Sequence, residues 1–128
     1  METSALMDAH VQAKRIYNLL NEVMDLSRQM AEAMDRDDQV AIRMLVSMRE
    51  EPVRKLRLAR QALAEQKEAL DPVSADRLAQ LLNGAEAEVE AEAPLAAQVG
   101  ANRRLLEQVL ELDRVLNRKL TREESVYS

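Results

Sequence analysis

Few side chains in this sequence are of a type and at a spacing that could perform chemistry. A metal site in a helical protein needs several ligands drawn together, such as Glu-x-x-His pairs or cysteine thiolates. The chain has one histidine, His10, and no cysteine. We therefore expect His10 to be a packed or half-exposed helix residue, and we expect no metal and no cofactor.

A second candidate is the acidic run in which Glu86, Glu88, Glu90 and Glu92 alternate with Ala or Val. Paired catalytic carboxylates and calcium ligands must converge on one point, whereas residues two apart do not share a face of a helix. The run is therefore interpreted as a solvated acidic surface. The sequence also has no Gly-rich phosphate loop, serine elbow or nucleophile–base pair, so we predict no catalytic residues and no enzyme.

The densest basic cluster is formed by Arg54, Lys55, Arg57 and Arg60. No aromatic residues are interleaved with it to stack on bases, and a net charge of −5 argues against general nucleic-acid binding. The cluster is interpreted as a solvated helix face. Docking of a partner or of an acidic segment is the alternative.

The composition predicts the elements that position these residues. Of 128 residues, 47% are hydrophobic and 32% charged, with only two Gly and three Pro. Ala, Leu, Glu, Arg, Gln and Met dominate, and these residues lose little on entering a helix. We predict one all-α domain over residues 1–128, an elongated antiparallel helical hairpin or three-helix bundle with a long C-terminal helix and coiled-coil-like packing.

The apolar runs are far shorter than the roughly 20 residues that span a bilayer. The N-terminal residues also lack a basic region followed by an apolar core. We therefore expect a cytoplasmic protein without membrane insertion.

The first helix is predicted over residues 4–34 from three adjacent columns of residues spaced by seven. A stripe of this width usually packs against two neighbouring helices. The columns are Leu6, Ala13, Leu20, Ser27 and Met34; Ala9, Ile16, Val23 and Met30; and His10, Tyr17, Met24 and Ala31.

The second helix is predicted over residues 39–69, capped by Asp37 or Asp38, and it forms a hairpin with the first. Pro52 predicts a kink or short break within it. A short helix over 74–83 follows, capped by Ser74 and closed by Asn83-Gly84. The C-terminal helix is predicted over 85–122, bent near Pro94 or Gly100.

The C-terminal helix carries an apolar arc about 160° wide at 100° per residue, broader than a simple seam. Asn102 and Asp113 fall inside this arc, where they must find partners or stay in water. The apolar residues of the arc, all predicted to contact a partner, are Leu105, Leu106, Val109, Leu110, Leu112, Leu116 and Leu120.

Two uses of this arc are open. The helix could pack between the first two helices as core, or the Leu110 and Leu112 edges and the part near Leu120 could stay open for an amphipathic partner helix. The methionines around the first turn fit either core packing or an adaptable binding surface. These are Met24, Met30, Met34, Met44 and Met48.

Two stretches resemble the FlgN-like flagellar type III export chaperones. "SRQMAEAMDRDDQVAIRMLVSMREEPVRKL", residues 27–56, is similar to their first hairpin, with an Asp-containing turn between two helices. "NRRLLEQVLELDRVLNRKLTREESVY", residues 102–127, is similar to their C-terminal helix, with an Asn before a Leu-Leu pair and a Tyr near the end.

The resemblance implies a cytoplasmic chaperone that binds the amphipathic C-terminal helix of hook-associated proteins at the hook-filament junction. It would prevent their premature assembly and deliver them to the export apparatus, with Leu105, Leu106, Val109, Leu112, Leu116 and Leu120 as partner contacts. The alternatives are a structural coiled-coil or bundle protein that self-associates as a homodimer, an acidic adaptor, and a FliT-like chaperone of the filament cap.

Overall fold

The regular elements of the described part of the chain are all helices. The computed structural model describes residues 1–127, and the side chains of residues 1–121. Over this range the elements are α1 (Thr3–Asp35), α2 (Gln39–Glu68), α3 (Pro72–Leu82), the short 3-10 helix η1 (Glu90–Glu92) and α4 (Ala93–Tyr127), with no strand. The predicted all-α bundle is confirmed.

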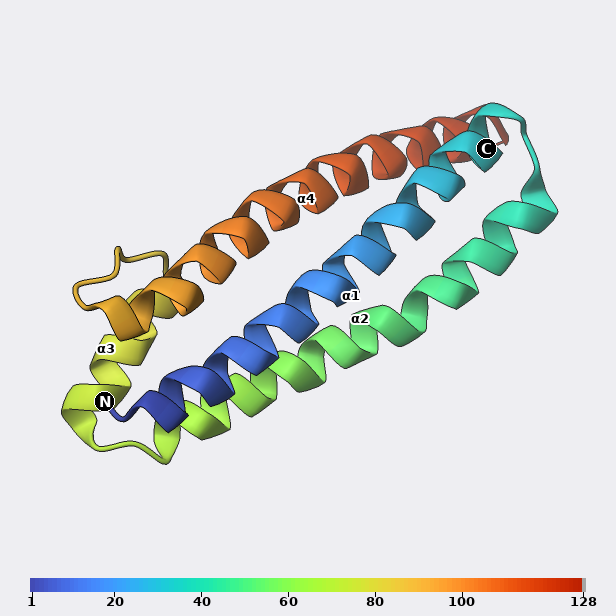
Figure 1. Ribbon diagram of the computed structural model, residues 1–128. Coiled ribbons are helices and arrows are strands. Elements are labelled where there is room, and N and C mark those ends of the chain that lie inside the picture. The colour runs from blue at the N-terminus through green and yellow to red at the C-terminus, as the bar shows by residue number, and fades with distance from the viewer. Residues whose placement is uncertain (128) are drawn as a thin grey trace.

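Helix α1 lies in the centre of the bundle, with α2 along one side and α4 along the other (Figure 1). The chain runs up α1, down α2 and up α4, so α4 is parallel to α1. The interpretation in which the C-terminal helix packs between the first two helices is wrong. The central place belongs to α1 because its three-column stripe is broad enough to face two neighbours, as predicted.

The turn between α1 and α2 is built by two aspartates. The Asp38 carboxylate caps α2 by accepting a hydrogen bond from the Ala41 N–H at 3.1 Å, and Asp37 adopts a left-handed φ of 55°. Helix α2 then continues through Pro52, whose ring is buried. The break considered at this proline does not occur.

Helix α3 begins at Pro72, two residues before the predicted start. Its cap is Asp71, which accepts from the Ser74 N–H at 3.1 Å, and Pro72 occupies the first turn, where its missing N–H costs little. The predicted cap at Ser74 is therefore wrong. The predicted stop is confirmed, because Gly84 adopts a φ of +99° directly after Asn83.

Helix α4 begins at Ala93, eight residues later than predicted. Residues 85–89 are not helical, and η1 leads into the helix. Pro94 consequently lies in the first turn of α4, and the helix continues through Gly100. The reason for the late start is a long-range ion pair of Glu92, described below.

The core forms three clusters along the bundle. At the end nearest the N-terminus, α3 packs against both α2 and α4 and contributes Leu78 and Leu81 to the first cluster. The middle cluster centres on Leu20, Val23 and Val109, and the third surrounds the α1–α2 turn. Because α3 fills only one end of the bundle, the middle is left to the three long helices alone.

Candidate functional site

A groove opens between α2 and α4 in the middle of the bundle. The backbones of these two helices stay apart along most of their length, although each packs closely on α1 (Figure 1). The resulting hollow, called here the α2–α4 groove, has a volume of about 490 Å³. Its apolar lining consists of Ala13, Ile16 and Leu20 from α1, Val53, Leu56 and Leu63 from α2, Leu82 from α3, and Val99 and Leu106 from α4.

Several of these side chains are only partly covered by the chain itself. Ile16, Val53, Leu56 and Leu106 are half-buried, because no fourth helix covers this stretch of α1. Leu82 and Asn83 mark the end of the groove nearest α3. The arrangement leaves an apolar hollow of the size that proteins use for ligands and partner side chains.

Beyond the opposite end of the groove, an ion pair connects its two walls. Arg49, one turn before Val53 on α2, donates from Nη2 to the Asp113 carboxylate of α4 at 2.6 Å. Asp113 is one of the two polar residues in the apolar arc of α4, and its predicted need for a partner is met here. The pair connects α2 to α4 directly, so it fixes the spacing of the walls.

The second polar residue of the arc, Asn102, lies in the groove itself. Its Nδ2 donates to the Ala13 carbonyl of α1 at 2.8 Å, and its Oδ1 accepts from Gln98 at 3.0 Å. The side chain is therefore satisfied across the α1–α4 interface, as predicted. This contact holds α4 on α1 beside the groove.

All charged side chains that line the α2–α4 groove are arginines. Arg57 and Arg60 lie on the α2 wall and Arg103 on the α4 wall. Arg103 donates to the Asn83 carbonyl at 2.6 Å, whereas Arg57 and Arg60 form no side-chain hydrogen bond or ion pair with any of residues 1–121. The groove is thus basic in a chain whose net charge is −5.

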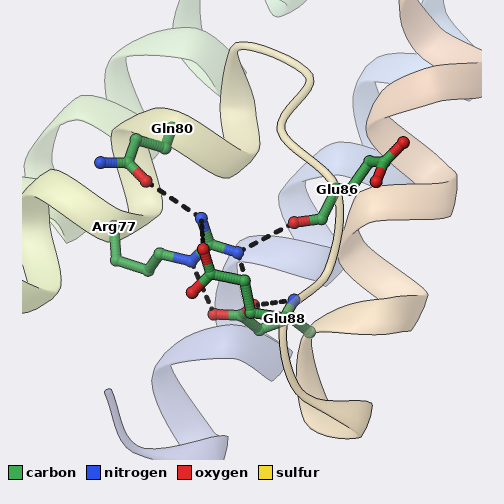
Figure 2. Close-up of polar contacts among 5 residues, drawn as sticks. Arg77, Gln80, Glu86 and Glu88 are labelled. Atoms are coloured by element: carbon green, nitrogen blue, oxygen red, sulfur yellow. Dashed lines mark hydrogen bonds and ion pairs between the residues drawn. The ribbon is translucent and has the colours of Figure 1, made fainter.

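An ion pair between half-buried Arg77 and buried Glu92 ties α3 to the segment before α4 (Figure 2). Arg77 donates from Nε and Nη2 to the two Glu92 oxygens at 3.0 and 2.7 Å, and also from Nη2 to the Glu86 carbonyl at 2.9 Å. The Glu92 carboxylate accepts a further bond from the Glu88 N–H at 2.9 Å. We call this set of contacts the Arg77–Glu92 clasp.

The clasp corrects the interpretation of the acidic run. Glu86, Glu88 and Glu90 are exposed, as predicted, but Glu92 is only 6% exposed. The hydrogen bonds from Arg77, with that from the Glu88 N–H, lower the pKa of Glu92 to about 2. Residues 85–89 are held in a loop, and α4 begins only after η1, because Arg77 binds both the Glu92 carboxylate and the Glu86 carbonyl there.

The predicted partner residues on α4 are distributed between core and surface. Leu105, Val109 and Leu116 are buried in the bundle, and Leu106, Leu112 and Leu120 are half-buried. Leu110 is 45% exposed. Of the seven residues only Leu106 lines the α2–α4 groove, and their contact with a partner stays a prediction.

Most of the groove was missed by sequence reasoning. The stripe analysis identified Ile16 as a core position, but no local pattern shows that α2 and α4 are too far apart to cover it. The basic cluster was identified, and its members are exposed, yet Arg57 and Arg60 border the groove.

The methionines divide between core and surface. Met44 and Met48 are exposed on α2. The other methionines near the first turn are buried, namely Met24, Met30 and Met34.

The remaining candidate residues lie apart from the groove. His10 is half-buried, and its Nδ1 has no hydrogen-bond partner among the described residues. Among those residues, no three His, Cys, Asp or Glu side chains are gathered as a metal site would require. None of the described helices has the length and hydropathy needed to cross a membrane.

Comparisons with known proteins found no match to a protein-family model, to a curated protein or to a solved structure. The candidate site is therefore defined by its geometry alone.

Proposed function

We propose that this protein is a cytoplasmic flagellar export chaperone of the FlgN-like type. In this proposal it binds the amphipathic C-terminal helix of hook-associated proteins, prevents their premature assembly and delivers them to the type III export apparatus. The resemblance of residues 27–56 and 102–127 to that family motivates the proposal. The observation that carries it is the α2–α4 groove.

The groove supports helix binding because the three long helices leave the position of a fourth helix uncovered. Ile16, Leu56 and Leu106 offer half-buried apolar surface along α1, α2 and α4. An amphipathic helix laid between α2 and α4 would cover this surface with side chains spaced by three and four residues. Such a helix would gain the burial that drives association without any rearrangement of the core.

The same geometry gives a mechanism for a chaperone. A hook-associated protein with an exposed apolar helix would associate with other copies through that helix. Covering the helix removes the surface available for polymerisation, and the complex persists only while the chaperone binds it. Release at the export apparatus exposes the helix again for assembly.

Replacing Leu106 with Trp tests this function. The indole fills the groove while keeping its lining apolar, so binding of a hook-associated protein from the same genome should weaken at least about tenfold. Val40→Trp is the matched control, since it adds an indole at an exposed apolar residue of α2 that neither lines the groove nor belongs to the predicted partner contacts. Titration calorimetry measures affinity, and circular dichroism checks that both variants stay helical.

Three results would contradict the proposal. The unmodified protein could fail to form a complex with any hook-associated protein, or Leu106→Trp could bind as tightly as the control. Binding to a filament-cap protein alone would instead indicate the FliT-like alternative.

A second candidate function is self-association. A further hollow of about 680 Å³ lies between α1 and α2 away from α4, and it is bordered by the exposed apolar residues Val11 and Leu58. Pairing of two hairpins through this face would give a homodimer. A solution mass of two chains that is unchanged by hook-associated proteins would favour this candidate over the chaperone.

A further inference from the structure

We propose that the α2–α4 groove selects partner helices whose apolar stripe is flanked by carboxylates on both edges. This inference rests on the proposed function and adds the chemistry of the partner. Arg57 and Arg60 would meet acidic residues along one edge of the bound helix, and Arg103 would meet an acidic residue along the other.

The positions of the arginines define the spacing of the carboxylates. Arg57 and Arg60 are three residues apart on α2, which separates them by about 4.5 Å along the helix axis. A partner helix lying along α2 would therefore present two acidic residues three or four positions apart. Arg103 lies on the facing wall, one turn before Leu106, so it would reach the opposite edge.

The hydrogen bonding of the three groove arginines favours binding of a carboxylate from a partner helix. Arg57 and Arg60 have no acidic partner among residues 1–121, and no acidic residue lines the groove. Arg103 is already oriented by its 2.6 Å bond to the Asn83 carbonyl, so its remaining N–H groups can bind a carboxylate with little further ordering. Hydrogen bonds between charged partners are stronger than neutral ones.

The net negative charge of the chain confines the attraction for an acidic helix to the groove. The chain carries 23 acidic and 18 basic residues, so its surface on average repels an acidic helix. The basic lining of the groove reverses that sign where the apolar surface is also available. An acidic amphipathic helix would thus be attracted to the groove and discouraged from binding elsewhere.

Two synthetic helical peptides test the inference on the full chain. Both carry the same leucine stripe, flanked by Glu in one peptide and by Lys in the other. Fluorescence anisotropy at low salt should show the Glu peptide binding at least about tenfold more tightly. The difference should shrink as salt is raised, because exposed charges are screened.

Charge reversal at the groove identifies which arginines act. The double variant R57E/R60E should bind the Lys peptide more tightly than the Glu peptide. The control R54E/K55E makes the same charge change at neighbouring positions that do not line the groove, and it should keep the original preference.

The outcomes separate the inference from the function on which it rests. The two peptides could bind equally well, with affinities that Leu106→Trp weakens and R57E/R60E leaves unchanged. This result would overturn the charge selection and leave the groove as a helix site. Failure of both peptides to bind would overturn the groove as a helix site and the inference with it. Occupation of the groove by a second copy of the chain, seen as an Arg57-dependent dimer, would also overturn the inference.

Discussion

Replacement of Glu92 by Gln should destabilise the protein measurably, because the Arg77–Glu92 clasp depends on the charge of this carboxylate. Gln keeps the size of the side chain and one acceptor oxygen but removes the negative charge. Arg77 would then retain the Glu86 carbonyl and the Gln80 side chain as partners. The helical content of the chain should not change.

The size of the effect follows from the pKa of Glu92. A pKa of about 2 instead of 4.5 corresponds to a preference of the fold for the charged form of at most about 3 kcal/mol. Solvent near the exposed Glu88 screens part of this interaction, so the measured loss in free energy of unfolding should be about 1–2 kcal/mol at pH 7.

The destabilisation caused by Glu92→Gln should decrease as the pH is lowered. A carboxyl whose pKa is lowered by folding contributes stability that is complete above its unfolded pKa of 4.5 and is lost as the pH falls toward 2. The difference between the original protein and Glu92→Gln should therefore shrink to less than about half at pH 3.

Urea denaturation followed by circular dichroism at pH 7 and pH 3 measures both quantities. Glu90→Gln is the matched control, because Glu90 is exposed in the same segment and its side chain forms no ion pair among residues 1–121. An equal loss in the two variants, or a loss at Glu92 that does not change with pH, would refute the reasoning.

Three further substitutions test other features. Ser27→Ala should raise the free energy of unfolding by about 1 kcal/mol in urea denaturation, because the hydroxyl is fully buried without a hydrogen-bond partner among the described residues; a loss would contradict this. Gly84→Ala should lower it by about 1 kcal/mol, since a side chain at φ +99° is strained and its Cβ would lie 3.3 Å from Nε of Arg103. A double-mutant cycle of Asp113→Asn with Arg49→Met should give a coupling energy of up to about 1 kcal/mol at low salt. The coupling energy should be smaller in 1 M NaCl, and a coupling energy unaffected by salt would argue against an ion pair.

The helices were predictable because their signals are local. The heptad columns of residues 4–34 identified a stripe wide enough for two neighbours, and the cap at Asp38 and the stop at Gly84 depend on residues within one turn. The start of α4 was not predictable in this way. It depends on Arg77, which is 15 residues from Glu92 in the sequence.

The groove was not predictable for a related reason. The sequence showed that Ile16 and Leu106 belong to apolar stripes, but their exposure depends on the separation of α2 and α4. That separation is set by the packing of both helices on α1, by α3 at one end and by Arg49 with Asp113 beyond the other. None of these contacts joins residues that are close in the sequence, so periodicity carries no information about them.

The central position of α1 also sets an order for the folding reaction. Helices α1 and α2 are joined by only three residues, 36–38, so they can pair soon after they form. Helix α4 reaches α1 through contacts as distant as 89 residues in the sequence, such as Asn102 with Ala13. Closing so large a loop takes longer, so the hairpin would be the nucleus and α4 the last helix to dock.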